Sequence, residues 1–262
     1  MDNRKDEKIL AARIADQIGA CENKYMITYT EFMDLHQRSL AESVIRDTGF
    51  RRYGFYGGYS EAERTIAVFL PEYIGTDSPE DYFRANPEDD PLTLIRFTHG
   101  KVGKELTHRD YLGALMGLGI RRDVTGDILV NSKGADAIVL HSIADFIEMN
   151  MTSAGRSSLS AVQTGIPDLV VPEQHFEERN VSVASLRLDN LLSAAFGISR
   201  SSAAEAVRSG LVFVDGIEMS KPDHQIDAGA RIVLRHKGKA VLSEIGRTTS
   251  KNRIHVRISR YK

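Results

Sequence analysis

The feature that most constrains the fold of this chain is the stretch LRLDNLLSAAFGISRSSAAEAVRSGLVFVDG, residues 186–216. Leucines between Leu186 and Leu192 recur at helical spacing and predict a short helix with one buried face. A second short helix, the apolar strand LVFV and the pair Asp215-Gly216 follow. Aspartate followed by glycine suits a type I′ hairpin turn. The stretch therefore predicts two small helices packed on a sheet that contains a hairpin.

The start of the second helix stays open at this level. Ser199 and Ser201 are both suitable N-caps, and Ser202 with Glu205 has the spacing of a capping box. At the other end, Gly210 suits the left-handed residue that often follows a helix.

Charge is distributed unevenly along the chain. From Ser182 to Lys262 there are 14 Lys and Arg against seven Asp and Glu, whereas residues 1–181 have 20 against 29. The overall net charge of −2 hides this difference. A basic segment attached to an acidic one indicates a module that binds a polyanion.

The predicted second helix places cations and hydroxyls together. Arg200 lies at its start, and Arg208 lies two turns later, about 12 Å along the axis. A helix start with serine hydroxyls, free backbone N–H groups and an arginine favours phosphate binding. Arg187 and Lys221 extend this basic patch. Phosphate contacts of this kind give affinity with little reading of base sequence.

Residues 183–239 resemble an S4 domain, a small RNA-binding module. The resemblance rests on R-L-D-x-x-L, S-R-S-x-A and SGLVFVDG, with Asp215-Gly216 where the family usually has Asn-Gly. In S4 domains the two helices and the following loop contact RNA. The resemblance therefore implies RNA contacts by Arg187, Asn190, Ser199, Arg200, Ser201, Arg208 and Lys221. Local pairing or capping is an equal alternative for Asp189 and Asn190, and a solvated position is an alternative for Arg208.

Upstream, periodicity predicts helices over residues 3–20 and from about Thr30 to Asp47, then a turn or hairpin and a strand over Thr65–Leu70. The next unit reads strand 92–99, helix 107–119, strands 127–131 and 136–141, helix 142–155 and strand 158–163. This is the ferredoxin-like order βαββαβ.

The fold class expected is thus α+β, in three parts. Residues 1–75 form an N-terminal helical region with a hairpin and strand, residues 76–180 form an RRM-like central domain, and residues 181–262 form an S4 domain with a basic C-terminal extension.

Two upstream stretches, FYGGYSEAERTIAVFLP and THRDYLGALMGLGIRRDVTGDILV, resemble the YlmH-type S4-domain proteins of bacteria and plastids. The resemblance covers nearly the whole chain. It implies a ribosome-associated factor that binds rRNA of the large subunit and contacts peptidyl-tRNA, in quality control of stalled translation. Cell division and photosystem assembly are the other roles linked to this family.

Catalysis is not expected. HRD at His108–Asp110 lacks the other kinase motifs, GALMGLG lacks the P-loop lysine, and eight scattered histidines lack metal-ligand spacing. Asp189 in Arg-Leu-Asp matches pseudouridine synthases only in a short motif. We therefore expect no cofactor, no metal and no catalytic residue. An RNA-modifying enzyme that uses its S4 domain for targeting is the alternative function.

The N-terminus has no apolar signal-peptide core, no apolar run is long enough to span a membrane, and Cys21 alone cannot form an internal disulfide. The chain is expected to be a cytoplasmic monomer without a preference for DNA.

In the central domain, Phe97 is one aromatic where a typical RRM has several. Arg96, Lys101, Lys104, Arg121 and Arg122 either contact RNA or are solvated. The tyrosines between Tyr53 and Tyr59 either stack on bases or pack in a hairpin.

Overall fold

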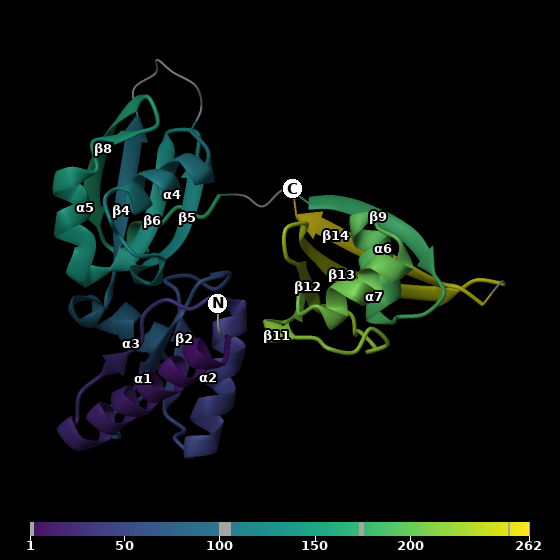
Figure 1. The fold of residues 1–262 in the computed structure, drawn as a ribbon, viewed down its shortest axis with the longest axis horizontal. Coiled ribbons are helices and arrows are strands. Elements are labelled where there is room, and N and C mark those ends of the chain that lie inside the picture. The colour runs from purple at the N-terminus through teal and green to yellow at the C-terminus, as the bar shows by residue number, and fades with distance from the viewer. Residues whose placement is uncertain (1–2, 100–105, 173–175, 251, 262) are drawn as a thin grey trace. The chain divides into compact units, whose positions relative to one another are not determined.

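The computed structural model describes residues 3–99, 106–172, 176–250 and 252–261. The chain divides into two compact units, Met1–Pro172 and Glu173–Lys262 (Figure 1). Each unit is described separately. None of the helices in the described part combines the length and the apolar character that a membrane crossing requires.

The first unit begins with a helical lobe around a small sheet. Its strands lie in the order β1-β3-β2. The elements are α1 (Asn3–Lys24), β1 (Thr28–Tyr29), α2 (Leu35–Thr48), β2 (Tyr53–Tyr56), β3 (Ile66–Phe69) and α3 (Pro79–Ala85). The first predicted helix is confirmed and continues to Lys24, with Cys21 buried in its packed face.

The prediction that the second helix starts near Thr30 is wrong by about one turn. Asp34 is the N-cap, and its carboxylate accepts from the backbone of Gln37 at 2.9 Å, while Gln37 reaches back to Asp34. Thr30 instead bonds to the backbone of Ala67 in the sheet. Gly49 ends the helix in the left-handed conformation, which glycine adopts without strain.

Strand β3 is buried on both faces, which explains its uninterrupted apolar sequence. Ala67 and Phe69 pack against α1 and α2. Ile66 and Val68 pack in a second cluster together with residues of the central sheet. The helical lobe and the central domain therefore share one core.

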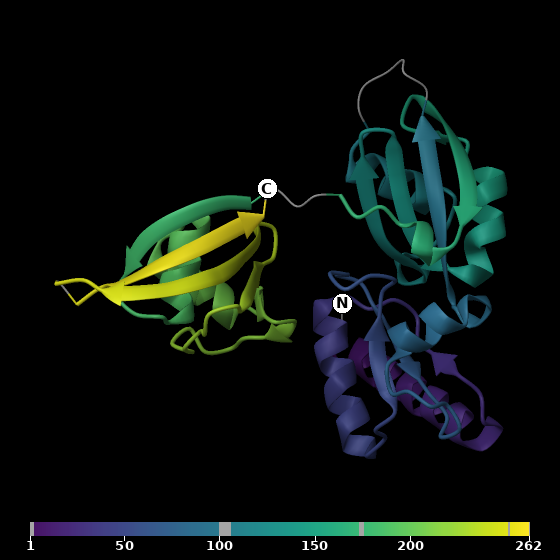
Figure 2. The ribbon, with the colours of Figure 1, turned by 180° about the vertical axis from the view of Figure 1, so that it is seen from behind.

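The central domain has a sheet in the order β5-β6-β4-β8-β7, all antiparallel, with helices on one face (Figure 2). The elements are β4 (Leu92–His99), α4 (His108–Gly117), β5 (Thr125–Asn131), β6 (Gly134–Leu140), α5 (Ala144–Asn150), β7 (Ser153–Ala154) and β8 (Ser157–Thr164). Short 3-10 turns lie at Pro87–Asp89, Arg122–Val124, His141–Ile143 and Ile166–Asp168. The predicted ferredoxin-like order is confirmed, with β7 added at one edge.

The helix predicted over 142–155 is too long. Ser142 lies in a 3-10 turn, α5 ends at Asn150, and Ser153–Ala154 turn back to pair with β8. Gly155, with φ of +58°, makes this tight return possible.

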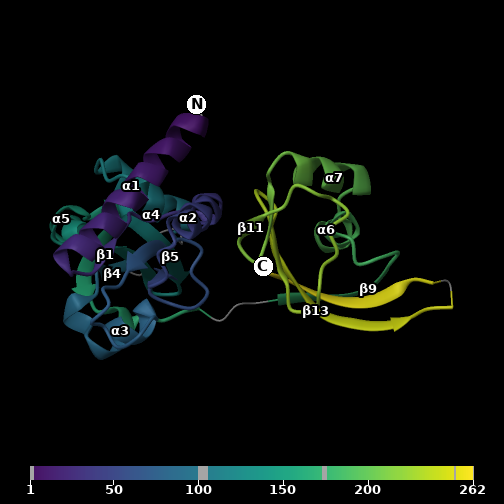
Figure 3. The same ribbon diagram turned by 90° about the horizontal axis from the view of Figure 1, so that it is seen from below.

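The second unit is a six-stranded sheet, ordered β11-β10-β12-β13-β14-β9, with two helices packed on one face (Figure 3). The elements are β9 (Phe176–Val183), α6 (Leu188–Phe196), α7 (Arg200–Arg208), β10 (Val212–Val214), β11 (Ile217–Glu218), β12 (Arg231–Leu234), β13 (Gly238–Thr248) and β14 (Ile254–Tyr261). The two-helix and hairpin prediction is confirmed. Asp215 and Gly216 have φ of +50° and +84°, as a type I′ turn needs.

Candidate RNA-binding surface

A buried carboxylate holds two arginines at the junction of α6 and α7. Asp189 is 3% exposed. It accepts hydrogen bonds from Arg187 at 3.2 and 3.1 Å and from Arg200 Nε at 3.0 Å. The side chains of Arg187 and Arg200 are 34% and 55% exposed. We call these three residues the Asp189 cluster.

The fold sets this geometry through the start of α6. Arg187 is the N-cap, and the loop after β11 bonds to the first turn. The N–H of Asp189 donates to Pro222 at 2.9 Å, and that of Leu188 donates to His224 at 2.8 Å. Lys221, which is exposed, precedes Pro222 directly, so this loop brings its backbone beside the Asp189 cluster.

Electrostatics keep the Asp189 cluster charged. Burial alone would raise the pKa of Asp189, but hydrogen bonds and charge from Arg187 and Arg200 lower it below its ordinary value. The hydrogen bond to Asp189 raises the pKa of Arg187. A guanidinium group has five N–H donors, and the carboxylate uses only part of them. The remaining donors are available to an anion.

Serine hydroxyls surround the start of α7. Ser199 is the N-cap, and its hydroxyl accepts from the backbone N–H of Ser202 at 3.1 Å, which settles where the helix begins. The hydroxyls of Ser201 and Ser202 lie 2.9 and 2.8 Å from that of Ser199. All three serines are exposed, next to the positive end of the helix.

The remaining predicted contacts have different surroundings. Arg208 is exposed in the last turn of α7. The amide of Asn190 donates to the Ser185 hydroxyl at 2.7 Å, so it also holds the connection from β9 to α6. RNA contact by each of the seven residues stays a prediction.

The face of the central sheet opposite α4 and α5 is largely covered by the helical lobe. Leu92, Leu94, Ile138 and Leu140 alternate toward the helical lobe and are buried in the shared core. Phe97 points to the opposite face, is 1% exposed, and stacks on Tyr111 at 5.8 Å. Base stacking of the RRM type therefore has no aromatic platform on β4–β6 and β8.

The basic residues of the central domain are largely occupied. Arg96 forms a two-pronged pair with buried Asp136 at 2.8 Å, and Arg121 pairs with Asp123 at 2.7 Å. Arg122 donates to the carbonyls of Thr125 and Gly126. Lys101 and Lys104 lie outside the described residues.

A second carboxylate–arginine arrangement joins the two upstream stretches singled out in the sequence. Asp127 accepts from the Tyr59 hydroxyl at 2.9 Å and from the N–H groups of Glu63 and Arg64 at 2.7 and 3.2 Å. Arg64 donates to the carbonyls of Thr125, Phe32 and Arg122 at 3.0–3.1 Å. We call Asp127 and Arg64, with these partners, the Asp127 joint.

Burial dominates the electrostatics of the Asp127 joint. It raises the pKa of Asp127 and lowers that of Arg64. Burial and the charge of Arg64 lower the pKa of Arg122 to about 10. The hydroxyl of Tyr56 donates to Asp90 at 2.7 Å, and that of Tyr59 donates to Asp127. Both tyrosines are thus packed within the fold, as the packed-hairpin interpretation predicts.

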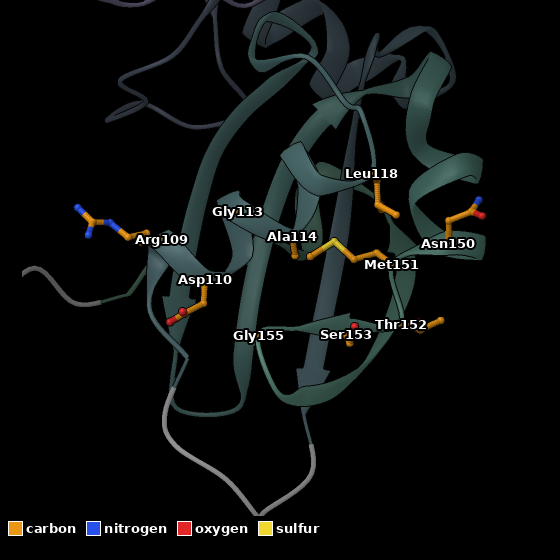
Figure 4. Close-up of a pocket in the computed structure, with 10 residues that line it drawn as sticks. All are labelled: Arg109, Asp110, Gly113, Ala114, Leu118, Asn150, Met151, Thr152, Ser153 and Gly155. Carbon is orange, nitrogen blue, oxygen red and sulfur yellow. The ribbon is translucent and has the colours of Figure 1, made fainter.

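A pocket of about 440 Å³ lies between α4 and the turn from α5 to β7 (Figure 4). Its charged lining residues are Arg109, which points away from it, and Asp110. Asp110 is bound to the backbone and hydroxyl of Thr107, both at 2.7 Å. Asp110 is therefore part of the capping box at the start of α4. Across the described chain, no three His, Cys, Asp or Glu side chains are placed to share a metal ion.

Comparisons with known proteins find one family model in each of the two units of the chain. The family model described as "Putative RNA-binding domain in YlmH" matches residues 86–166, and the S4 domain model matches residues 186–232. "Ribosome-associated protein quality control protein P2" of Bacillus subtilis (strain 168) is 30% identical over 263 residues, which is 99% of this chain and 97% of the relative. A solved structure, "Cell division protein ylmH from Streptococcus pneumoniae", is 20% identical with a TM-score of 0.47, and the match covers 63% of this chain and 94% of that chain.

Proposed function

This chain belongs to the YlmH family of S4-domain proteins, and from that premise we propose that it is a non-enzymatic RNA-binding protein of the ribosome. It docks on structured rRNA of the large subunit, next to peptidyl-tRNA, and acts in the cytoplasm in quality control of stalled translation. The name of the Bacillus subtilis relative supports the association with ribosomes.

The observation that carries the proposal is the Asp189 cluster. Its two arginines are held by a buried carboxylate, yet their side chains remain 34% and 55% exposed. An exposed ion pair adds little to the stability of a fold. An arginine that is already held in place has its donors directed toward a phosphate and loses less conformational entropy on binding.

Docking follows from these groups. Arg187 and Arg200 contact phosphates from one side, while the serine hydroxyls and N–H groups at the start of α7 contact the same backbone. Arg208 extends the contact two turns further along α7. Affinity then comes mainly from charge and shape, as expected for a folded rRNA target.

The test is Arg200→Glu combined with Arg208→Glu in the full chain. We expect the double variant to lose co-sedimentation with large ribosomal subunits while its far-UV circular dichroism stays unchanged. Wild-type binding should weaken steeply as salt rises, because phosphate contacts release counterions.

Lys8→Glu combined with Lys24→Glu is the matched control. Both residues are exposed on α1, outside the two matched RNA-binding domains, and the change in net charge is the same. This control should sediment with large subunits as the wild type does. If the Arg200/Arg208 variant also does so, docking through the S4 domain is wrong.

A further inference from the structure

The hairpin of β13 and β14 extends as an arm beyond the packed body of the second unit (Figure 2). We define the arm as residues 243–253. Residues 243–248 are exposed in succession, and none of the described arm residues belongs to the core cluster, which ends at Leu242 and resumes at Ile254. The arm also lies outside residues 186–232, the part that matches the S4 domain model. Its packing therefore contributes little to stability.

The arm has the side chains that contact nucleic-acid backbones. Its sequence, SEIGRTTSKNR, is rich in hydroxyls and cations and contains no aromatic residue. Its one carboxylate, Glu244, is paired with Arg257. Arg247 is exposed and has no hydrogen-bond or ion-pair partner among the described residues.

Hydrogen bonds link Thr249 to Asn252 and Arg253 near the tip of the arm. The N–H of Asn252 donates to the carbonyl of Thr249 at 2.9 Å, and that of Arg253 donates to the Thr249 hydroxyl at 3.0 Å. Asn252 has φ of +56°, a conformation that asparagine tolerates better than most residues. Arg247 lies in β13 at a register shift between Ile245 and Thr248, and Arg253 directly precedes β14.

The arm starts from the same end of the unit as the Asp189 cluster. The guanidinium of Arg253 donates to the carbonyl of Ser182, near the end of β9. Strand β9 ends at Val183, and the chain reaches Arg187, the N-cap of α6, four residues later. The connection from β9 to α6 thus has the base of the arm at one end and the Asp189 cluster at the other.

We propose that the arm is a second RNA contact of this unit and that its ligand is double-helical RNA. Arg247 and Arg253 bind phosphates of one strand while the Asp189 cluster binds the other, so the unit grips the duplex across a groove. The absence of aromatic residues argues against an unpaired strand, which proteins bind largely by stacking. This inference rests on the proposed function and adds the form of RNA that the S4 unit recognises.

The test uses the full chain and two fluorescent RNAs, a 20-base-pair duplex and an unstructured single strand of about the same charge per strand. Arg247→Glu combined with Arg253→Glu should lower duplex affinity about tenfold or more. It should also reduce the slope of log affinity against log salt by about two, one for each lost phosphate contact. Binding to the single strand should change by less than about twofold. Arg247→Gln combined with Arg253→Gln, which keeps the side-chain polarity, should lose the same slope with a smaller loss of affinity.

Lys8→Glu with Lys24→Glu again controls for net charge. The arm proposal is overturned if the arm variant binds duplex as the wild type does, or if this control loses as much affinity. Arg200→Glu with Arg208→Glu separates the two proposals in the same assay. If only that variant loses binding, the arm is wrong and the S4 surface stands; if neither loses binding, the proposed function itself fails.

Discussion

The Asp189 cluster and the Asp127 joint are both built from aspartate and arginine, but the arginine donors have different partners in the two. In the Asp189 cluster, one carboxylate holds two arginines whose side chains are 34% and 55% exposed. In the Asp127 joint, Arg64 directs its donors to three backbone carbonyls, and Asp127 accepts from a hydroxyl and two backbone N–H groups. The first leaves donors for a ligand, and the second uses its donors within the protein.

The difference shows how to interpret arginine and aspartate in a sequence such as this one. A buried carboxylate beside an arginine does not by itself indicate a binding site or a stabilising contact. The partners of the other guanidinium donors decide between the two. Where they end on carbonyls, the pair is part of the fold. Where they reach solvent beside a helix start, the pair is a candidate site for phosphate.

The largest effect is expected from Arg64→Leu. This change removes a half-buried cation and leaves three carbonyls without their donor, so it should lower the free energy of unfolding by about 3–5 kcal/mol. Urea denaturation followed by far-UV circular dichroism measures it, since the chain has no tryptophan.

Arg109→Leu is the control, because Arg109 is exposed on α4. It should change stability by less than about 0.5 kcal/mol. If the Arg64→Leu protein is as stable as this control, the Asp127 joint does not stabilise the contact between the stretches at Tyr59–Arg64 and Arg122–Asp127. The contrast with the Asp189 cluster would then be wrong.

An intermediate effect is expected from Asp189→Asn. The substitution removes a negative charge from a basic surface, so charge alone predicts tighter RNA binding. We expect binding to weaken about tenfold instead, because Arg187 and Arg200 lose the anchor that directs them. Electrophoretic mobility shift with structured rRNA fragments measures the change.

Glu205→Gln sharpens this result. Glu205 is exposed on α7, and its neutralisation should leave affinity equal or slightly higher. If Asp189→Asn behaves like Glu205→Gln, the carboxylate does not position the arginines.

The smallest effect concerns pH. The pKa of Asp189 is lowered in the fold, so its stabilisation is present above its ordinary value and is lost as pH falls through the native pKa. The pKa of Asp127 is raised, so its contribution is largest below its ordinary value and is lost as pH rises through the native pKa. The stability difference between wild type and Asp189→Asn should therefore shrink between about pH 5 and about pH 3.

For Asp127→Asn, the same difference from wild type should grow over that acid range. Denaturation at several pH values gives both curves. Parallel curves for the two variants would show that the two carboxylates have similar surroundings.

The sequence predicts most elements of this fold because each has its own signal. Val212–Val214 is an apolar strand followed by a turn with two positive φ angles, and β3 is an apolar run buried on both faces. Strand β9 has no such signal. Its sequence, FEERNVSV, is polar because much of it lies at a solvated surface, and its pairing with β14 depends on residues far along the chain.

The candidate site was predictable in its residue types and not in its geometry. The S4 pattern indicates Arg187 and Arg200, but only the crossing of α6 and α7 shows that both bind Asp189. The family resemblance singles out the two stretches that contain the Asp127 joint but not its contacts, because Tyr59 and Glu63 lie more than 60 residues from Asp127.

The sequence of β9 also matters while the second unit folds during its synthesis. The ribosome synthesises Phe176–Val183 well before Ile254–Tyr261, the strand with which β9 pairs. Until then β9 is an unpaired edge, and an unpaired edge strand invites pairing with other chains. Glu177, Glu178 and Arg179 place charge along it, which discourages such pairing. The polarity that hides β9 from sequence-based prediction thus protects the nascent chain from aggregation during translation.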